Sequence, residues 1–435
     1  MKTLTPISLL FLLLFFCAET SGQYRYDRYR GSSAKAKNSY LGEIFPFGYR
    51  GENTAVKYKF QYIQGKILPH SDRVKPLVGD YVRGGEFAVE FPRYGGEDWY
   101  FYFNYPTTAW GLLYYDLGEP YKLGSALAFY PYLNLPLLHF QRFSFNIKMG
   151  AGLAYISQKY DPGKPNNFAE NNFAIGSYLN GFLALGANFE LALSKSHSSP
   201  LSHFSLTADG ALNHFSNGSI QKPNAGLNMF NVGAGVKYIP YMAPAFMKYK
   251  TAGRRKDWEI EGALAAGINE QHVSDPRKYL NMSLMIGGYR PLTNRYRLGF
   301  NVDAFYNGAF FAERTLPEYY AGEDAKVRAG FSLANELMFG DLTAGFHAGL
   351  YIFNLIKHDG FSYFKLLAKY RVYDRIFVTV ALKTHLEVAE FCELGIGYTF
   401  TSREKTPFSW IPEKEPKQKA EKPPLKYRMK RLFKK

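Results

Sequence analysis

The sequence contains little cysteine and no long hydrophobic run beyond its N-terminal end. Only two of its 435 residues are cysteine, Cys17 and Cys392. Cys17 falls in an expected leader peptide, so Cys392 would have no internal partner and a disulfide-stapled fold is excluded. No later stretch reaches the ~18 uninterrupted apolar residues of a transmembrane helix. A bundle of membrane-spanning helices is therefore excluded as well.

Recognition patterns for nucleotides and metals are also missing. Gly150-x-Gly152 and Gly233-x-Gly235 lack the third glycine of a dinucleotide fingerprint and fall inside expected strands, and no P-loop is present. The histidines other than His214 are scattered, without metal-ligand spacing to another histidine, a cysteine or a carboxylate. We therefore expect no metal and no other cofactor.

The N-terminus has the features of a secretory signal peptide. Lys2 is followed by an apolar segment at residues 7–16, which is too short to span a bilayer. Small residues, Thr20 and Gly22, precede the expected cleavage point before Gln23. We expect residues 1–22 to be a signal peptide and residues 23–53, which are polar, to be a flexible N-terminal segment.

The C-terminus concentrates the positive charge of the chain. Residues 401–435 carry twelve Lys/Arg against four Asp/Glu, which is +8 of the total of +16. This Pro/Lys-rich stretch predicts a disordered basic tail on the periplasmic side, and weak contact with acidic peptidoglycan is the alternative to a solvated extension. Because the remainder is only mildly basic, the charge does not indicate nucleic-acid binding.

Aromatic residues are abundant and occur in short alternating segments. The chain is 17% aromatic, with 35 Tyr and 37 Phe, and its mean hydropathy is only −0.26. Few patterns have a helical period. The clearest segment is 143–157, in which every second residue from Phe143 to Tyr155 is apolar. Such strands, with one apolar and one polar face, are typical of outer-membrane β-barrels.

Similar segments recur along the whole chain. They lie at 55–67, 84–91, 109–117, 122–133, 143–157, 173–193, 204–216, 228–239, 258–267, 279–290, 295–306, 327–338, 342–352, 361–371, 375–386 and 390–400. They predict an all-β, transmembrane, antiparallel up-and-down β-barrel of about 16 strands (14–16). Two 8-stranded barrels divided near residues 240–257, or a soluble β-sandwich, are the alternatives. An even strand number would place both termini in the periplasm and the end of 204–216 at the outer rim.

Two chemically active side chains occur at the end of the segment 204–216. His214 and Ser216 are two residues apart, so they share one face of a strand. Counting back, that face also carries Leu206 and Leu212, whereas Asp209 lies on the other. In a barrel the apolar face contacts lipid. An imidazole and a hydroxyl on one face are two components of a nucleophilic hydrolase.

The stretch from His214 to Asn228, His-Phe-Ser-Asn-Gly-Ser-Ile-Gln-Lys-Pro-Asn-Ala-Gly-Leu-Asn, resembles the signature of the lipid A 3-O-deacylase (PagL) or acyloxyacyl-hydrolase-like family of outer-membrane barrels. The resemblance covers about residues 80–240. It implies a serine esterase that removes an ester-linked acyl chain from lipid A of lipopolysaccharide. On this basis we expect a deacylase-like barrel half at 54–240 and additional barrel strands at 241–400.

The resemblance assigns a role to each site residue by position. Ser216 would be the nucleophile and His214 the general base. Asn228 stands where the family has a glutamate that orients the histidine. An amide oxygen can accept the imidazole N–H bond, but it cannot stabilise the imidazolium as a carboxylate does. Asn228 shares the parity of the lipid-facing residues of its segment, so the three side chains are expected to meet on the outer surface.

The remaining assignments concern the transition state. The resemblance implies that the Asn224 side-chain amide and the Ser219 backbone N–H stabilise the oxyanion. Asn217 is expected to support the turn or the site. The expected substrate is lipid A or lipopolysaccharide in the outer membrane.

Two other functions remain open at this point. A catalytically inactive, structural barrel is favoured by the departure at Asn228. An outer-membrane transport pore is favoured by the strands beyond eight, and a wide lumen with inward Arg297 and Asp303 would support it. Glu259 and Glu261 alternate on one segment and are expected to line a polar interior.

Overall fold

The computed structural model describes residues 56–93, 97–140, 142–194, 196, 198–240, 257–311, 326–355, 360–385 and 388–400. The expected signal peptide, the flexible N-terminal segment and the basic tail lie outside this range. Within the described residues, no helix is long and apolar enough to cross a membrane.

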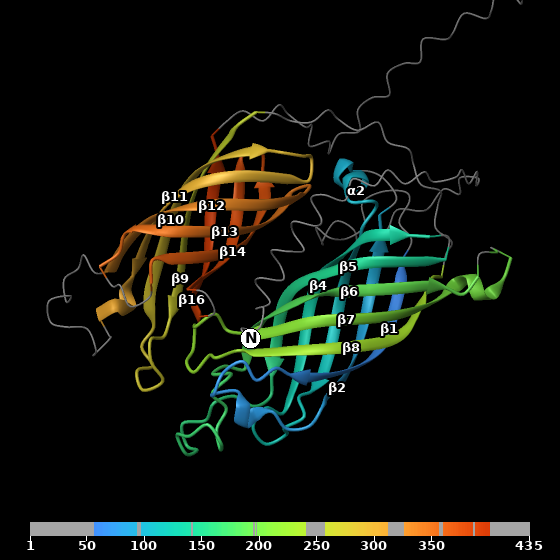
Figure 1. Cartoon of the computed structure of the whole chain (residues 1–435), viewed down its shortest axis with the longest axis horizontal. Coiled ribbons are helices and arrows are strands. Elements are labelled where there is room, and N and C mark those ends of the chain that lie inside the picture. Colours follow the sequence, from blue (N-terminus) through green and yellow to red (C-terminus); the bar gives the residue numbers. More distant parts are fainter. Residues whose placement is uncertain are drawn as a thin grey trace, which may run out of the picture. The chain divides into compact units, whose positions relative to one another are not determined.

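The structure is built from two sets of antiparallel strands (Figure 1). The first set contains β1 (Lys57–Ile67), β2 (Val82–Pro92), β3 (Thr107–Asp116), β4 (Ser125–His139), β5 (Phe143–Ile156), β6 (Leu179–Ala192), β7 (Phe204–Ser216) and β8 (Leu227–Tyr238). The second contains β9 (Glu259–Asn269), β10 (Tyr279–Pro291), β11 (Tyr296–Asn307), β12 (Val327–Phe339), β13 (Leu342–Phe353), β14 (Ser362–Tyr373), β15 (Ile376–His385) and β16 (Val388–Thr399). Short helical turns are η2 (Lys75–Leu77), α2 (Asp98–Tyr102), η3 (Pro200–His203) and η4 (Gly308–Phe311).

Each set closes on itself. β1 pairs with β8, and β9 pairs with β16, so the described strands form two closed barrels of eight strands. The prediction of an all-β antiparallel barrel protein with sixteen strands is confirmed. The arrangement is the two-barrel alternative, not the single sixteen-stranded barrel, because β8 bonds to both β7 and β1 and leaves no free edge for β9. The soluble β-sandwich is excluded by the same closure.

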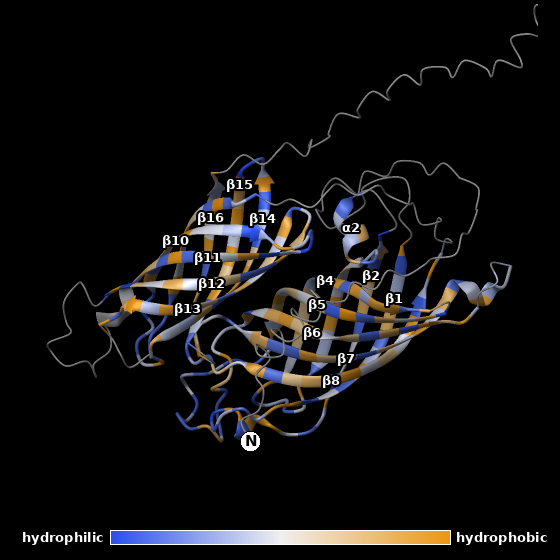
Figure 2. Ribbon diagram, turned by 45° about the horizontal axis from the view of Figure 1, so that its top comes forward, coloured by the Kyte–Doolittle hydropathy of each residue, from blue (hydrophilic) through white to orange (hydrophobic). Residues whose placement is uncertain are grey.

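The strands alternate between a lumen face and an outer face. Along β7, Asp209 and Asn213 are buried, whereas Leu206 on the other face is 46% exposed. On β8, the outward Phe230 and Val232 are 50% and 53% exposed. Hydrophobic and hydrophilic residues accordingly alternate along the ribbons of both barrels (Figure 2). Large apolar side chains on the outside and polar ones inside are the pattern of a membrane barrel.

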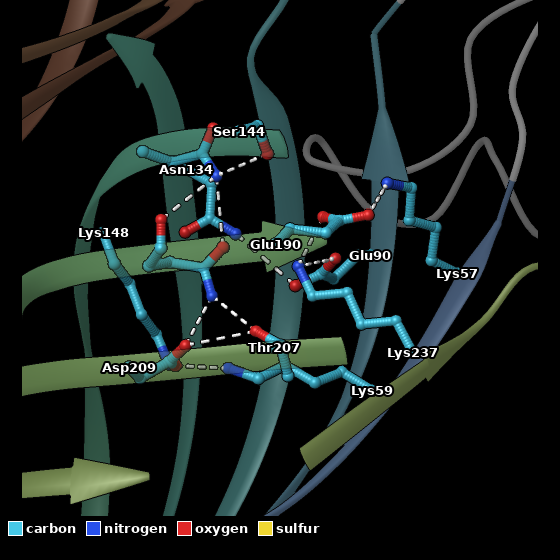
Figure 3. A network of polar contacts seen from close by, with 12 residues as sticks. Lys57, Lys59, Glu90, Asn134, Ser144, Lys148, Glu190, Thr207, Asp209 and Lys237 are labelled. Atoms are coloured by element: carbon cyan, nitrogen blue, oxygen red, sulfur yellow. Dashed lines mark hydrogen bonds and ion pairs between the residues drawn. The ribbon is translucent and has the colours of Figure 1, made fainter. Parts of the chain in front are cut away.

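The lumen of the first barrel is filled by paired charges. Lys59 Nζ lies 2.5 Å from Asp209 Oδ2 and 3.2 Å from Glu86 Oε2. Lys148 Nζ lies 2.8 Å from Glu86 Oε1 and 3.5 Å from Asp209 Oδ2. Lys59 and Lys148 converge on Asp209 in Figure 3. The interior of an eight-stranded barrel is just wide enough to be filled by side chains, and here buried ions occupy it in opposite-charge pairs.

The lumen of the second barrel follows the same principle. Arg297 contacts Glu259, Glu261 and Glu336 at 2.6–2.7 Å. His347 is fully buried against Glu336, with Nε2 3.0 Å from Oε1. The expectation that Glu259 and Glu261 face inward is therefore confirmed. The wide lumen that would favour a pore is not found among the described residues, because these inward side chains are buried by one another.

Candidate active site

The site lies where β7 ends and β8 begins. His214 and Asn228 are direct partners in the antiparallel ladder between these strands, and Ser216 is opposite Gly181 on β6. His214 and Ser216 alternate with Asn213 and Phe215, which are buried. The prediction that His214 and Ser216 project from the outer face of the barrel is therefore confirmed.

His214 is held by Asn228. Its Nδ1 atom lies 2.6 Å from Asn228 Oδ1. A carbonyl oxygen only accepts hydrogen bonds, so Nδ1 is the protonated nitrogen and donates, which leaves Nε2 as the proton acceptor. This is the tautomer that a general base requires, and the amide of Asn228 supplies the contact that selects it.

Ser216 is held by different groups. Its Oγ atom accepts hydrogen bonds from Asn224 Nδ2 at 2.9 Å and from Gly218 N at 3.1 Å. Among the described residues, no hydrogen bond joins Ser216 to His214. The hydroxyl thus rests among the N–H donors of the loop, and rotation of the Ser216 side chain is needed to bring Oγ to His214 Nε2. Hydrogen bonds of catalytic groups are often long before substrate binds.

Asn217 fixes the orientation of these donors. Its backbone N–H donates to Asn224 Oδ1 at 3.0 Å, so the Asn224 amide must direct its NH₂ group toward Ser216. The Asn217 side chain donates to Ser177 Oγ at 2.8 Å and to Gln221 O at 2.9 Å. Asn217 therefore supports the loop and does not contact the nucleophile through its side chain.

Backbone geometry brings the loop close to the imidazole. Gly226 has φ +78°, and a Cβ added to it would lie 2.9 Å from His214 Cε1. Gly218 and Ser219 have φ values of +63° and +68°. No hydrogen bond of the Ser219 N–H is found within the described part of the chain. Glycine tolerates positive φ, whereas Ser219 adopts it only under the constraint of its surroundings.

Several contacts near the site were not predicted from the sequence. His70, in the loop after β1, has Nε2 3.1 Å from Ala225 O. Glu270, at the end of β9, accepts a hydrogen bond from the Lys222 backbone N–H at 2.6 Å. Burial and the nearby Arg73 lower the pKa of Lys222, while Glu270 opposes the shift. These contacts join segments that are far apart in sequence, so no local pattern indicated them.

Comparison with protein families divides the chain as the two barrels do. Residues 83–237 match the family described as lipid A 3-O-deacylase (PagL). Residues 258–403 match the family described as acyloxyacyl hydrolase, C-terminal domain. The first match includes Ser216, His214 and Asn228, and the second includes every strand of the second barrel. The comparison with curated proteins gave no match.

Solved structures match the chain only at low identity and low TM-score. A crystal structure of the outer membrane enzyme PagL is 14% identical, has a TM-score of 0.27, and covers 41% of this chain and 98% of that one. Two variants of Rh. blastica porin are 9% and 8% identical, with TM-scores of 0.17 and 0.16, and each covers 80% of this chain and 100% of its own. At these TM-scores neither likeness adds to the geometry above. The two family matches therefore show that the chain contains a PagL lipid A 3-O-deacylase domain at residues 83–237, followed by an acyloxyacyl hydrolase C-terminal domain at residues 258–403.

Proposed function

We propose that this chain is an outer-membrane serine esterase that removes an ester-linked acyl chain from lipid A. The observation that carries the proposal is the contact of His214 Nδ1 with Asn228 Oδ1, on the lipid-facing side of the barrel and two residues from Ser216. This contact leaves the other imidazole nitrogen free to accept a proton. It lies within the part of the chain that matches the deacylase family.

The reaction would begin with attack of Ser216 Oγ on the ester carbonyl carbon. His214 Nε2 takes the hydroxyl proton, and Asn228 holds the imidazole through Nδ1. As the tetrahedral intermediate collapses, the C–O bond of the ester breaks and His214 returns the proton to the departing alcohol oxygen. A water molecule, deprotonated by His214, then hydrolyses the acyl-serine and releases the fatty acid. No metal or cofactor has a role in these steps.

The oxyanion would be stabilised by the groups that surround Ser216 Oγ at rest. Asn224 Nδ2 and Gly218 N already donate to that oxygen, at 2.9 and 3.1 Å. When Ser216 rotates toward His214, these donors are released for the negatively charged carbonyl oxygen, together with the Ser219 N–H. Such preorganised donors commonly contribute a factor of about 10²–10³ to kcat each.

The outward position of the site suits a lipid substrate. The acyl ester of lipid A lies at the boundary between headgroup and chains in the outer leaflet. A site on the outer wall at the rim of the barrel meets that ester by lateral diffusion, without removal of the lipid from the membrane. The proposal places both termini in the periplasm and the end of β7 at the outer rim.

Basic groups beside the site favour an anionic headgroup. Arg73 is exposed and lies close enough to Lys222 to lower its pKa. Lys222 follows the Ser216–Asn217 turn in the same loop. The exposed positive charge of Arg73 would attract the phosphates of lipid A.

Mass spectrometry of lipid A tests the proposal in cells. Cells that express the full chain should contain lipid A lighter by one acyl chain than cells without the gene, and Ser216→Ala should restore the heavier form. Equal lipid A masses with and without the wild-type gene would favour the inactive barrel, which Asn228 in place of the family glutamate also favours. A liposome conductance assay on the same protein tests the pore, for which the filled lumens predict no porin-like current.

A further inference from the structure

The loop that follows Ser216 contacts the second barrel. The described residues as far as Phe400 lie in one compact unit. Within it, Glu270, the residue after β9, is bonded to this loop at two points. Its backbone N–H donates to Ser219 O at 2.9 Å, and its Oε2 atom accepts from the Lys222 backbone N–H at 2.6 Å. The Glu270 side chain is 7% exposed.

We propose that Glu270 of the second barrel is a positioning residue for the oxyanion-binding loop of the first. The proposal rests on the function proposed above and extends it, because it makes the C-terminal domain part of the active site. Glu270 touches neither substrate nor Ser216. It acts by fixing residues 219–222, whose conformation sets the direction of the Gly218 and Ser219 N–H groups.

Other contacts from the second barrel hold the same loop. Lys278, on the far side of the β9–β10 turn, donates from Nζ to Glu270 Oε1 at 2.6 Å and to Ile220 O at 2.5 Å. Ser219 Oγ donates to Ala389 O at 2.6 Å, on β16. The loop is therefore bonded to β16 and to both sides of the β9–β10 turn.

Close packing reinforces these bonds. A Cβ added to Gly218 would lie 2.1 Å from Cys392 Sγ, on β16. Cys392 and Leu394 lie on the same, outward face of β16. Leu394 is 66% exposed, whereas Cys392 is only partly exposed. The loop thus covers one position of the outer wall of the second barrel.

The loop needs such support because its backbone is strained. Gly218 and Ser219 adopt positive φ in succession. A non-glycine residue keeps that conformation only when the surrounding structure determines it. Glu270 bonds Ser219 through its backbone and Lys222 through its side chain, so it holds the strained segment on both sides. Loss of the side chain should release Lys222 while leaving the His214–Asn228 contact intact.

The test compares three variants of the full chain in detergent micelles. Glu270→Ala removes the acceptor for Lys222 N–H, whereas Glu270→Gln keeps one acceptor oxygen for Lys222 N–H but loses the charge and the second acceptor, which Lys278 Nζ uses. Asp275→Asn is the matched control, since Asp275 lies in the same turn and, among the described residues, its side chain bonds to Arg277 in that turn and to Tyr279 at the start of β10, and not to the loop that follows Ser216. We expect Glu270→Ala to lower kcat about 10- to 100-fold, as partial loss of oxyanion stabilisation does. KM and the pH profile should stay unchanged, Asp275→Asn should remain near wild type, and Glu270→Gln should recover part of the kcat lost in Glu270→Ala.

Hydrogen exchange of residues 217–222 provides a readout that does not depend on catalysis. We expect faster amide exchange in this segment in Glu270→Ala, and wild-type exchange in Asp275→Asn. If wild-type protein has no esterase activity but Glu270→Ala still speeds exchange, the proposed function fails and the positioning role stands. Wild-type exchange in Glu270→Ala, or full kcat in an active enzyme carrying that change, would overturn the positioning role.

Discussion

His214 on β7 and Asn228 on β8 face each other directly across the antiparallel ladder, and the imidazole Nδ1 lies 2.6 Å from the amide oxygen. A neutral oxygen orients the ring but stabilises its charged form less than a carboxylate would. Asn228 therefore selects the tautomer that a general base requires, but it makes His214 a weaker base than a carboxylate partner would.

Asn228→Glu should raise kcat. A hydrogen bond to a charged acceptor is worth about 1–1.5 kcal/mol more than a neutral one, which corresponds to about a tenfold gain in rate. Asn228→Ala removes the orienting oxygen and should lower kcat by at least about tenfold. Initial rates on a soluble ester substrate measure both, with folding checked by the gel mobility of unheated protein. A higher rate for Asn228→Ala than for wild type would show that this residue does not orient the base.

Gly226→Ala should disable the site without unfolding the barrel. The added Cβ would lie 2.9 Å from His214 Cε1, so the imidazole must shift away from its position beside Ser216. We expect kcat to fall at least about tenfold, because small displacements of catalytic groups cost that much or more. Gly360→Ala is the matched control, since Gly360 also has positive φ, +85°, but nothing lies within 4 Å of the added atom. Equal loss in both variants would assign the effect to backbone strain.

Arg73→Gln should weaken recognition of a phosphorylated substrate. The charge of Arg73 acts on Lys222, which lies in the loop that follows Ser216, and its removal should raise KM for lipid A about 3- to 10-fold at low salt. The KM for an uncharged short-chain ester should not change. Arg142→Gln, in the connection between β4 and β5, is the control for loss of a surface charge. An equal change for charged and uncharged substrates would contradict a role in phosphate binding.

Glu86→Ala should destabilise the first barrel. Glu86 pairs with both Lys59 and Lys148 in the lumen, and all three are buried. Breaking a buried pair from one side leaves uncompensated charge and typically costs about 3–5 kcal/mol. Urea unfolding in lipid vesicles measures the change in unfolding free energy. Asp72→Asn, which removes an exposed pair with Lys75, should leave the unfolding free energy close to that of the wild type.

The alternation of polar and apolar residues predicts the strands well, but it does not predict how the strands close into barrels. The predicted segment 204–216 coincides with β7, because its polar and apolar residues alternate to the end. The segment 173–193 was predicted too long: Phe173, Ala174 and Ile175 are buried in a loop before β6, where Phe173 packs against Tyr160. Closure depends on the pairing of β8 with β1, which lies far away in sequence. No local pattern separates two barrels of eight strands from one of sixteen.

The sequence also predicts only part of the candidate site. Strand parity predicts that His214 and Asn228 share the outer face, since both lie on regular strands. The hydrogen bonding of Ser216 with Asn224 and Gly218 was not predicted, because it depends on the conformation of the loop after the strand. Glu270, the residue after β9, reaches that loop although it is 48 residues away from Lys222 in the sequence. Contacts of this kind follow from tertiary structure alone.

Hydrolysis of lipid A by the purified full chain, compared with Ser216→Ala, tests the central claim most directly. Mass spectrometry of the products should show one free fatty acid per lipid A consumed by the wild type, and none above background with Ser216→Ala. Intact lipid A after incubation with folded wild-type protein, or equal release by the alanine variant, would contradict Ser216 as the nucleophile of a lipid A esterase.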